Sequence, residues 1–133
     1  MAQNKFERLI DQVKSWGGDR SDISAILLVG SHARGQARVD SDVDLVIIST
    51  CPESYFLDRP WLEDFGPVLK SEVEDWGLVQ SLRVWFKNGL EVEFGFTTQK
   101  WITLPLDAGT AQVLRDGFIF LVDKAGYASV IIL

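Results

Sequence analysis

Two aspartates, one residue apart, are the first feature of this sequence that could perform chemistry. Asp42 and Asp44 open an apolar segment, residues 43–48, that is typical of a strand buried on both faces. Side chains two positions apart on a strand lie on the same face of the sheet, so the two carboxylates project together. Mg²⁺ typically takes one or two protein carboxylates and completes its shell with water and substrate phosphate. The pair therefore predicts a magnesium site.

A glycine and a serine precede the aspartates, at the end of another apolar segment, residues 23–29. Gly30 lacks a Cβ, so the chain can turn tightly there and the following amides can approach a phosphate closely. Ser31 adds a hydroxyl beside those amides. We expect a short helix over residues 31–36, whose unpaired N-terminal amides and positive dipole end face a triphosphate. Arg34, within that helix, is expected to contact phosphate or to cap the turn.

Together, the two features resemble the signature of the nucleotidyltransferase superfamily, whose members move a nucleoside monophosphate from a nucleoside triphosphate to an acceptor hydroxyl or phosphate. The matching segments read Gly-Ser, Ala-Arg-Gly and Ser-Asp-Val-Asp, at residues 30–31, 33–35 and 41–44. They are similar in particular to those of the small bacterial branch that includes aminoglycoside-type and minimal antitoxin-type nucleotidyltransferases. The overall resemblance covers residues 23–126. It implies an α/β fold with a nucleotidyltransferase-like mixed, twisted sheet of four to five strands and helices mainly on one face.

A later pair of strands is expected to supply further carboxylates on one face of the sheet. Residues 79–87 and 90–97 flank Asn88-Gly89, the strongest short-range signal of a β-hairpin. In the second strand, Glu91 and Glu93 alternate with apolar residues. Both acids therefore face the same way.

The register of this hairpin decides which neighbours the two acids have. A two-residue turn places Glu91 opposite Phe86 and Glu93 opposite Val84, which are unfavourable neighbours for carboxylates without a role. A slip of one residue would move both acids to the other face. The resemblance implies a third carboxylate here, which completes the metal site or activates the acceptor hydroxyl. Glu93 matches best and Glu91 is the reserve candidate. Because the family more often has Asp there, the role of the glutamate, as metal ligand or as base, stays open. A solvated pair of glutamates without a function is also left open.

Patterns on either side of these motifs indicate the elements that position them. Asn4 and Glu7 can form a capping box for an amphipathic helix that the glycines at residues 17–18 end. Its apolar residues recur at helical spacing: Phe6, Leu9, Ile10, Val13 and Trp16. Residues 107–115 predict a second capped helix, and residues 118–122 predict a last strand.

Other segments leave two interpretations open. Residues 58–66 begin like a helix, whereas residues 68–76 show no clear pattern. Several aromatic residues favour a core over a pocket for a base or acceptor: Tyr55, Phe56, Trp61, Phe65 and Trp76. Lys124 follows the last strand, where the family often has Asp-Lys, and either reaches a phosphate or lies in a turn. His32 is not expected to be catalytic, because metal-assisted phosphoryl transfer needs no imidazole.

Length and composition indicate a single domain, residues 1–133. The net charge of -6 and the scattered 13 Lys and Arg argue against nucleic-acid binding, which usually needs a basic stripe. The sequence has no apolar run of about 18 residues, and its first residues lead into an amphipathic pattern. We therefore expect a cytoplasmic protein without a membrane contact. Cys51 is the only cysteine, which excludes an internal disulfide and a cysteine metal cluster.

The resemblance, together with the paired acids, implies Mg²⁺-dependent transfer of a nucleoside monophosphate, AMP from ATP as the first choice, to a hydroxyl of a small molecule or partner protein. A non-enzymatic module for nucleotide sensing or antitoxin-like binding is the alternative. The resemblance implies that transferases acting on small antibiotics add a helical second domain, whereas this sequence ends about seven residues after Gly126. We therefore expect a homo-oligomer or a separate helical partner chain, with the apolar residues 130–133 as a contact.

Overall fold

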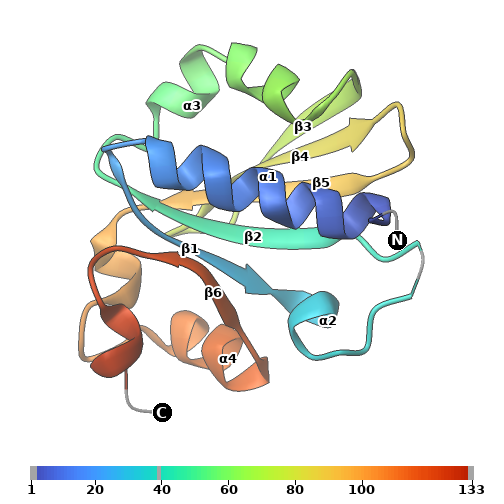
Figure 1. Ribbon diagram of the computed structural model, residues 1–133. Helices are drawn as coiled ribbons and strands as arrows, with labels where there is room; N and C mark the ends of the chain where they lie inside the picture. Colours follow the sequence, from blue (N-terminus) through green and yellow to red (C-terminus); the bar gives the residue numbers. More distant parts are fainter. Residues whose placement is uncertain (1–2, 39, 132–133) are drawn as a thin grey trace.

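Six strands form one twisted sheet in the computed structural model, which describes residues 3–38 and 40–131 (Figure 1). The strands are β1 (Ile23–Val29), β2 (Val43–Ser49), β3 (Val68–Asp75), β4 (Gln80–Phe86), β5 (Glu91–Thr97) and β6 (Ile119–Asp123). Their order across the sheet is β3-β4-β5-β2-β1-β6. β2 and β5 run parallel, and every other neighbouring pair is antiparallel. The mixed α/β sheet is therefore confirmed, with six strands instead of the predicted four to five.

The additional strand is β3, in the segment whose sequence shows no clear pattern. It lies at one edge of the sheet, where it pairs only with β4 within the described chain. Leu69 and Val73 remain 66% and 51% exposed, so apolar residues do not alternate onto a buried face here. A strand that joins the sheet by backbone pairing at its edge leaves little periodic signal in the sequence. The expected strand number was too low for that reason.

The hairpin between β4 and β5 has a three-residue loop, and the predicted two-residue turn is wrong. The Phe86 amide donates to the Leu90 carbonyl at 2.8 Å, and the Gly89 amide donates to the Phe86 carbonyl at 3.1 Å. Gly89 adopts a φ of 93°, which closes the loop as a type I turn followed by a bulge residue does. Asn88 precedes this glycine inside the longer loop.

This loop shifts the strand register by one residue relative to the prediction. Glu91 lies opposite Trp85, and Glu93 lies opposite Arg83, so neither acid faces the apolar partner predicted for it. The two acids still share one face of β5, because they are two residues apart. They lie on the face that carries Arg83 and not on the face that carries the main apolar core.

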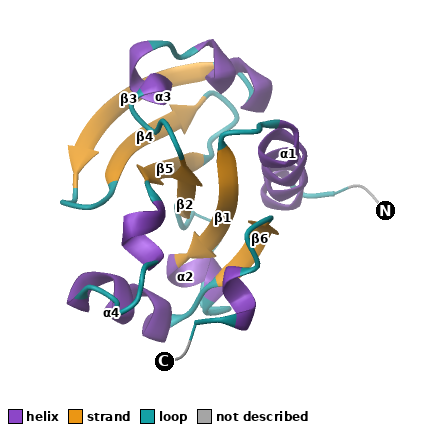
Figure 2. Cartoon of the chain, turned by 90° about the vertical axis from the view of Figure 1, so that its left-hand side faces the viewer, coloured by secondary structure: helices purple, strands orange, loops and turns teal. Residues whose placement is uncertain are grey.

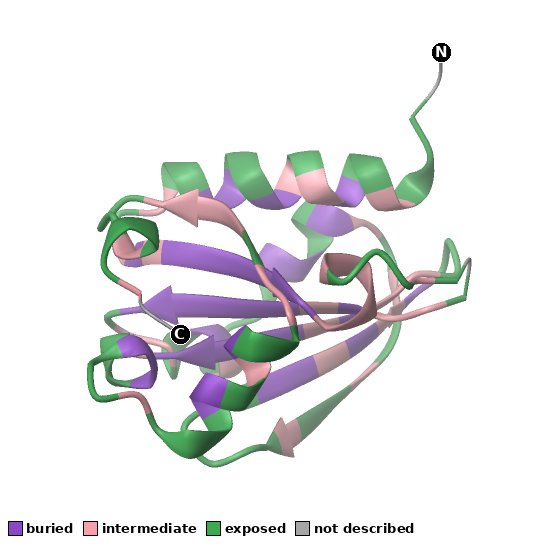
Figure 3. Cartoon of the chain, turned by 90° about the horizontal axis from the view of Figure 1, so that it is seen from below, coloured by how far each residue is buried: buried purple, intermediate pink, exposed green. Residues whose placement is uncertain are grey.

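One face of the sheet carries the longest helix and two shorter ones, and this face holds most of the core (Figures 1 and 2). The three elements are α1 (Lys5–Asp19), α3 (Ser54–Leu57) and the 3₁₀ helix η1 (Pro60–Phe65). In Figure 3, α1 is buried only along the side that faces the sheet. The residues on that side, Leu9, Val13 and Trp16, follow the predicted helical spacing.

The opposite face carries smaller helical elements and a second apolar cluster. These elements are η2 (Gln99–Ile102), α4 (Ala108–Asp116) and η3 (Tyr127–Ser129). Trp101 and Leu114 pack there against the central strands β1 and β2. The helical cover is thus larger on the α1 face, as predicted, but the second face is also partly covered.

Both predicted helices begin with a side-chain cap, although Glu7 Oε1 accepts from the Asn4 side chain at 3.0 Å and not from its backbone amide as a capping box requires. The aromatic residues are largely structural. The Asn4 side chain accepts from the Glu7 amide at 2.8 Å at the start of α1. The Asp107 carboxylate accepts from the Gly109 amide at 3.0 Å at the start of α4. Three of the aromatic residues are buried in the main core, which confirms the core interpretation for them: Tyr55, Trp61 and Phe65.

The segment after β6 returns to the end of α1. Lys124 Nζ donates to the Gly17 carbonyl at 2.9 Å and to the Arg20 carbonyl at 2.8 Å, as a turn residue would. Of the predicted apolar contact, Val130 is 55% exposed, whereas residues 132–133 lie outside the described residues. None of the helices in the described part of the chain has the length and apolar character that a bilayer crossing requires.

Candidate active site

Three carboxylates meet on the face of the sheet opposite α1, where β2 and β5 run side by side. One oxygen from each of Asp42, Asp44 and Glu93 lies within 4.8 Å of the others. The parallel pairing puts Asp44 directly beside Glu93, and Asp42 precedes Asp44 by two residues on the same face. The structure thus brings together the three acids that the sequence indicated. Glu91, the reserve candidate, is not part of this group among the described residues.

Gly30 lets the Asp44 carboxylate lie against the turn that follows β1. Its φ is 73°, a left-handed backbone conformation that L side chains rarely adopt. A Cβ at this position would stand 2.2 Å from Asp44 Oδ2, far inside van der Waals contact. Glycine is therefore required for two independent reasons, conformation and space.

The turn continues into α2 (Gly30–Ala33), a helix of four residues that is shorter than predicted. Gly35 adopts a φ of 70°, and the Gln36 amide donates back to the Ser31 carbonyl at 3.0 Å. A left-handed glycine with this bond pattern ends a helix, so the predicted continuation over residues 31–36 stops after one turn. The first amides of α2 have no partners within the helix, as at any helix start.

Among the described residues, Arg34 forms no ion pair with the three carboxylates. Its exposed side chain packs against Gly117, and its Nε is 3.5 Å from Gln36 Oε1. The structure places this residue at the end of α2, and its contact with phosphate stays a prediction.

His32 connects the start of α1 with the loop before β2. Its ring stacks on Phe6 with centroids 4.1 Å apart, and its Nε2 lies 3.4 Å from the Ser41 carbonyl oxygen. These contacts give His32 a structural role in holding the loop that leads to Asp42.

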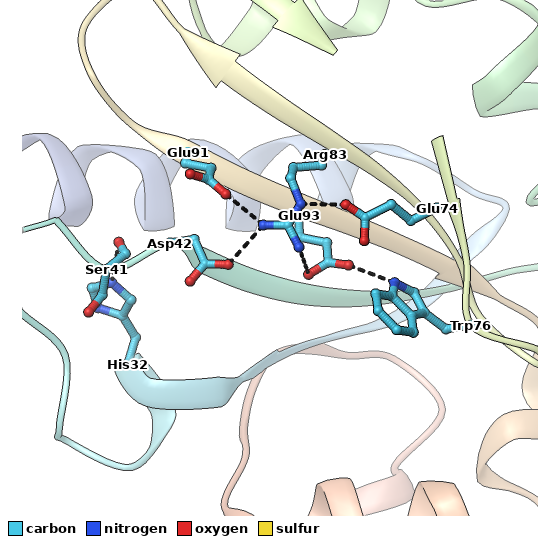
Figure 4. A network of polar contacts seen from close by, with 8 residues as sticks. All are labelled: His32, Ser41, Asp42, Glu74, Trp76, Arg83, Glu91 and Glu93. Carbon is cyan, nitrogen blue, oxygen red and sulfur yellow. Dashed lines mark hydrogen bonds and ion pairs between the residues drawn. The ribbon is translucent and has the colours of Figure 1, made fainter. Parts of the chain in front are cut away.

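A basic residue that the sequence analysis missed, Arg83 on β4, lies among the acids (Figure 4). Its Nη1 is 3.2 Å from Asp42 Oδ2 and 2.6 Å from Glu91 Oε2, and its Nη2 is 3.3 Å from Glu93 Oε2. Its Nε donates to Glu74 on β3, and this bond is the largest cause that raises the pKa of Arg83 above the usual range. Arg83 could have been predicted only from the correct hairpin register, which places it opposite Glu93.

Glu93 has a second donor in Trp76, which follows β3. Trp76 Nε1 donates to Glu93 Oε1 at 2.9 Å, although Trp76 is 62% exposed. Trp76 therefore lies beside the carboxylates and outside the aromatic core, so the core interpretation is wrong for this residue. No local sequence pattern indicates the contact, because it depends on the pairing of β3, β4 and β5.

The crowding of acids changes their affinity for protons. Burial, followed by repulsion from Asp42 and a hydrogen bond with Glu93, raises the pKa of Asp44 to about 8. A nearby cation would favour the charged form of Asp44 and oppose this shift. The electrostatics of the site therefore favour the arrival of positive charge.

The donor set also fits a divalent cation. Four carboxylates contact one guanidinium, so acidic charge exceeds basic charge even without Asp44: Asp42, Glu74, Glu91 and Glu93. Three hard oxygen ligands on neighbouring strands suit Mg²⁺, and hydrogen bonds from outer residues are usual at metal sites. Asp42, Asp44 and Glu93 thus form a candidate acidic metal site.

A comparison with protein families agrees with this geometry. A family model described as a nucleotidyltransferase domain matches residues 7–100. The matched range contains the Gly30 turn, both aspartates and Glu93. A search of curated protein sequences finds no match to this chain.

One solved structure shows a related fold, and a second aligns more weakly. An aminoglycoside 6-adenyltransferase from Bacillus subtilis aligns with a TM-score of 0.60 and 17% identity, over 75% of this chain and 37% of that chain. The Cid1 poly(U) polymerase aligns with a TM-score of 0.49 and 17% identity, over 69% of this chain and 29% of that chain. The chain therefore spans well under half the length of the adenyltransferase, and the likeness concerns the fold. Because the family model covers more than half of the sequence, the chain belongs to the nucleotidyltransferase domain family.

Proposed function

We propose that this protein transfers a nucleoside monophosphate from a nucleoside triphosphate to a hydroxyl of a small molecule or a partner protein. The observation that carries the proposal is the meeting of Asp42, Asp44 and Glu93 within 4.8 Å, beside the left-handed turn at Gly30. Membership of the nucleotidyltransferase domain family supports nucleotidyl transfer as the general reaction. AMP from ATP is the first choice, because the adenyltransferase named above shares the fold.

The three acidic residues are proposed to bind the cation and to activate the acceptor hydroxyl. Asp42 and Asp44 would hold Mg²⁺, and Glu93 either completes its shell or orients and deprotonates the acceptor hydroxyl. Bound there, the ion supplies positive charge that offsets the charge developing on the phosphates as pyrophosphate leaves. The rigid neighbouring strands keep these carboxylates in place before substrate arrives.

The turn after β1 is the proposed site for the outer phosphates. The Gly30 and Ser31 amides stand at the start of α2, next to Asp44, and their N–H groups can donate to phosphate oxygens. Arg34, one turn further on, is proposed as an additional phosphate contact. Catalysis then consists mainly of positioning and charge neutralisation.

A second polypeptide, as a homo-oligomer or a separate helical partner, is proposed to complete the acceptor pocket in the cytoplasm. The support is the openness of the site, since the side chains of Asp42 and Glu91 remain 36% and 32% exposed. Light scattering during turnover checks this point, with a complex larger than one chain as the expected result. A monomer that turns over substrate alone would contradict it.

Incubation with α-labelled ATP, then the other triphosphates, plus Mg²⁺ and cell extract tests the proposed reaction. Label on a protein band identifies a partner-modifying enzyme, and label on a small molecule identifies a small-molecule transferase. Asp42→Asn is the control, because it preserves side-chain size but removes the charge of a proposed ligand. Absence of label from every triphosphate would contradict the proposed transfer.

A nucleotide-sensing or antitoxin-like binding module without transfer is the second candidate, and one observation favours it. Arg83 forms ion pairs with Asp42 and Glu93, so part of the acidic charge is balanced without a cation. Tight ATP binding without any transfer of label would favour this function.

A further inference from the structure

Donors engage both carboxylate oxygens of Glu93 (Figure 4). Trp76 Nε1 donates to Oε1 at 2.9 Å, and Arg83 Nη2 donates to Oε2 at 3.3 Å. The Glu93 side chain is only 16% exposed. A glutamate side chain has several rotatable bonds, so two donors on opposite oxygens restrict it to one orientation.

The Trp76 donor is fixed by the turn between β3 and β4. The Trp76 amide donates to the Val79 carbonyl at 2.8 Å, and the Gly77 amide donates to Asp75 Oδ1 at 2.9 Å. These bonds close the turn and direct the indole toward Glu93 on the far side of β4. An exposed tryptophan is thereby kept at a defined place beside the acids.

The Arg83 donor is fixed by acids from both neighbouring strands. Glu74 on β3 and Glu91 on β5 accept hydrogen bonds from its guanidinium. The same group reaches Asp42 at 3.2 Å, so Arg83 contacts two of the three carboxylates that form the candidate metal site. A planar guanidinium with five donors holds several carboxylates in one geometry, which a lysine ammonium does not.

We propose that Trp76 and Arg83 are positioning residues that orient Glu93 as the third ligand of a divalent cation. This inference rests on the cation site of the proposed function. It assigns the ligand role to Glu93, and it gives Glu91 a different role, that of fixing Arg83. Outer hydrogen-bond partners orient metal ligands, and their loss typically weakens metal binding about 10- to 100-fold.

A Mn²⁺ titration followed by electron paramagnetic resonance tests the role of Trp76 without nucleotide or turnover. Trp76→Phe keeps an aromatic ring and the net charge but removes the N–H donor, so Mn²⁺ should bind about tenfold more weakly. Trp85→Phe is the matched control. Trp85 lies on the same face of β4 as Arg83, and Lys70 Nζ is 4.3 Å from its ring centroid. This variant should bind Mn²⁺ as the wild type does.

Two Arg83 variants separate positioning from simple electrostatics. Loss of a positive charge beside a cation site by itself tightens cation binding. Simple electrostatics therefore predicts tighter binding for Arg83→Met and unchanged binding for Arg83→Lys. Positioning predicts weaker binding for Arg83→Lys, because the charge is kept and the planar fork is lost.

Asp42→Asn distinguishes failure of the inference from failure of the proposed function. If wild type binds Mn²⁺, Asp42→Asn does not, and Trp76→Phe binds like wild type, the cation site stands and the positioning inference is wrong. Equal weakening in Trp76→Phe and Trp85→Phe would also overturn the inference. If wild type binds no Mn²⁺, both proposals fail together. Circular dichroism checks folding, and if the Arg83 variants do not fold, the two tryptophan variants decide.

Discussion

Gly30 shapes the candidate site through the absence of a side chain. The Asp44 carboxylate occupies the space that a Cβ would need, with Oδ2 2.2 Å from the ideal Cβ position. The φ of 73° is a second and independent demand for glycine. Any larger residue must move the turn or rotate the Asp44 carboxylate, and either change alters the geometry between the proposed phosphate site and the proposed cation site.

We expect Gly30→Ala to lower the free energy of unfolding by about 1 to 3 kcal/mol, the usual range for a strained backbone position. Gly18→Ala is the matched control, because Gly18 lies in α1 with nothing within 4 Å of an added Cβ. Alanine at this helical position should raise the free energy of unfolding by about 0.5 to 1 kcal/mol. Urea unfolding curves measure both changes. An unchanged midpoint for Gly30→Ala would contradict the steric demand at this turn.

Asp44 should give the metal-free protein a pH-dependent stability. Its pKa is 3.8 as the reference for an unfolded chain and about 8 in the folded protein. Between these values the folded state holds one more proton than the unfolded state, so the free energy of unfolding falls as pH rises. Asp44→Asn has no proton to lose at this position, so its free energy of unfolding should not fall in this way. The variant should be as stable as wild type near pH 4 and more stable than wild type near pH 8. Parallel stability curves for the two proteins, measured by urea unfolding without divalent cations, would show that Asp44 is not perturbed.

At the scale of elements, local signals predict some parts of the fold and pairing decides the others. α1 and α4 carry side-chain caps, and β1 and β2 are largely apolar and buried, so their positions could be predicted from the sequence. β3 could not, because an exposed edge strand has no buried face to impose a period of two. The predicted hairpin register was wrong because the Asn88-Gly89 pair does not specify the loop length. In the structure, Gly89 with its positive φ closes a three-residue loop.

The same distinction applies to the candidate site. Gly30, Asp42 and Asp44 lie within one short stretch of sequence, so their spacing revealed them. Arg83 and Trp76 come from a distant hairpin and reach the acids only through the pairing of β3, β4 and β5. A pattern within one segment contains no information on such contacts.

Lys124 gives a test of how the last strand is joined to α1. Its ammonium donates to the Gly17 and Arg20 carbonyls, and positive charge is favourable at a helix C-terminus. Lys124→Met should lower the free energy of unfolding by about 1 kcal/mol while leaving the affinity for Mg²⁺-ATP unchanged. Lys14→Met, at an exposed position of α1, should change stability by less than about 0.5 kcal/mol. Loss of ATP affinity at constant stability would instead assign Lys124 to phosphate binding.

For the molecule as a whole, charge sets a condition on substrate binding. The protein carries a net charge of -6, and a nucleoside triphosphate is itself strongly negative. Long-range attraction cannot gather such a substrate, so binding depends on local positive charge at the candidate site. Arg83 already forms ion pairs with four carboxylates. A divalent cation is therefore the group that can bridge these acids and the phosphates.

Titration calorimetry with ATP, in the presence and absence of Mg²⁺, tests the central claim most directly. We expect wild type to bind ATP only when Mg²⁺ is present, because the acidic site repels the free nucleotide. Asp42→Ala should lose the Mg²⁺-dependent binding while its circular dichroism spectrum stays that of the folded protein. Equal binding heats for wild type and Asp42→Ala, or ATP binding that is independent of Mg²⁺, would contradict a cation-dependent nucleotide site at Asp42, Asp44 and Glu93.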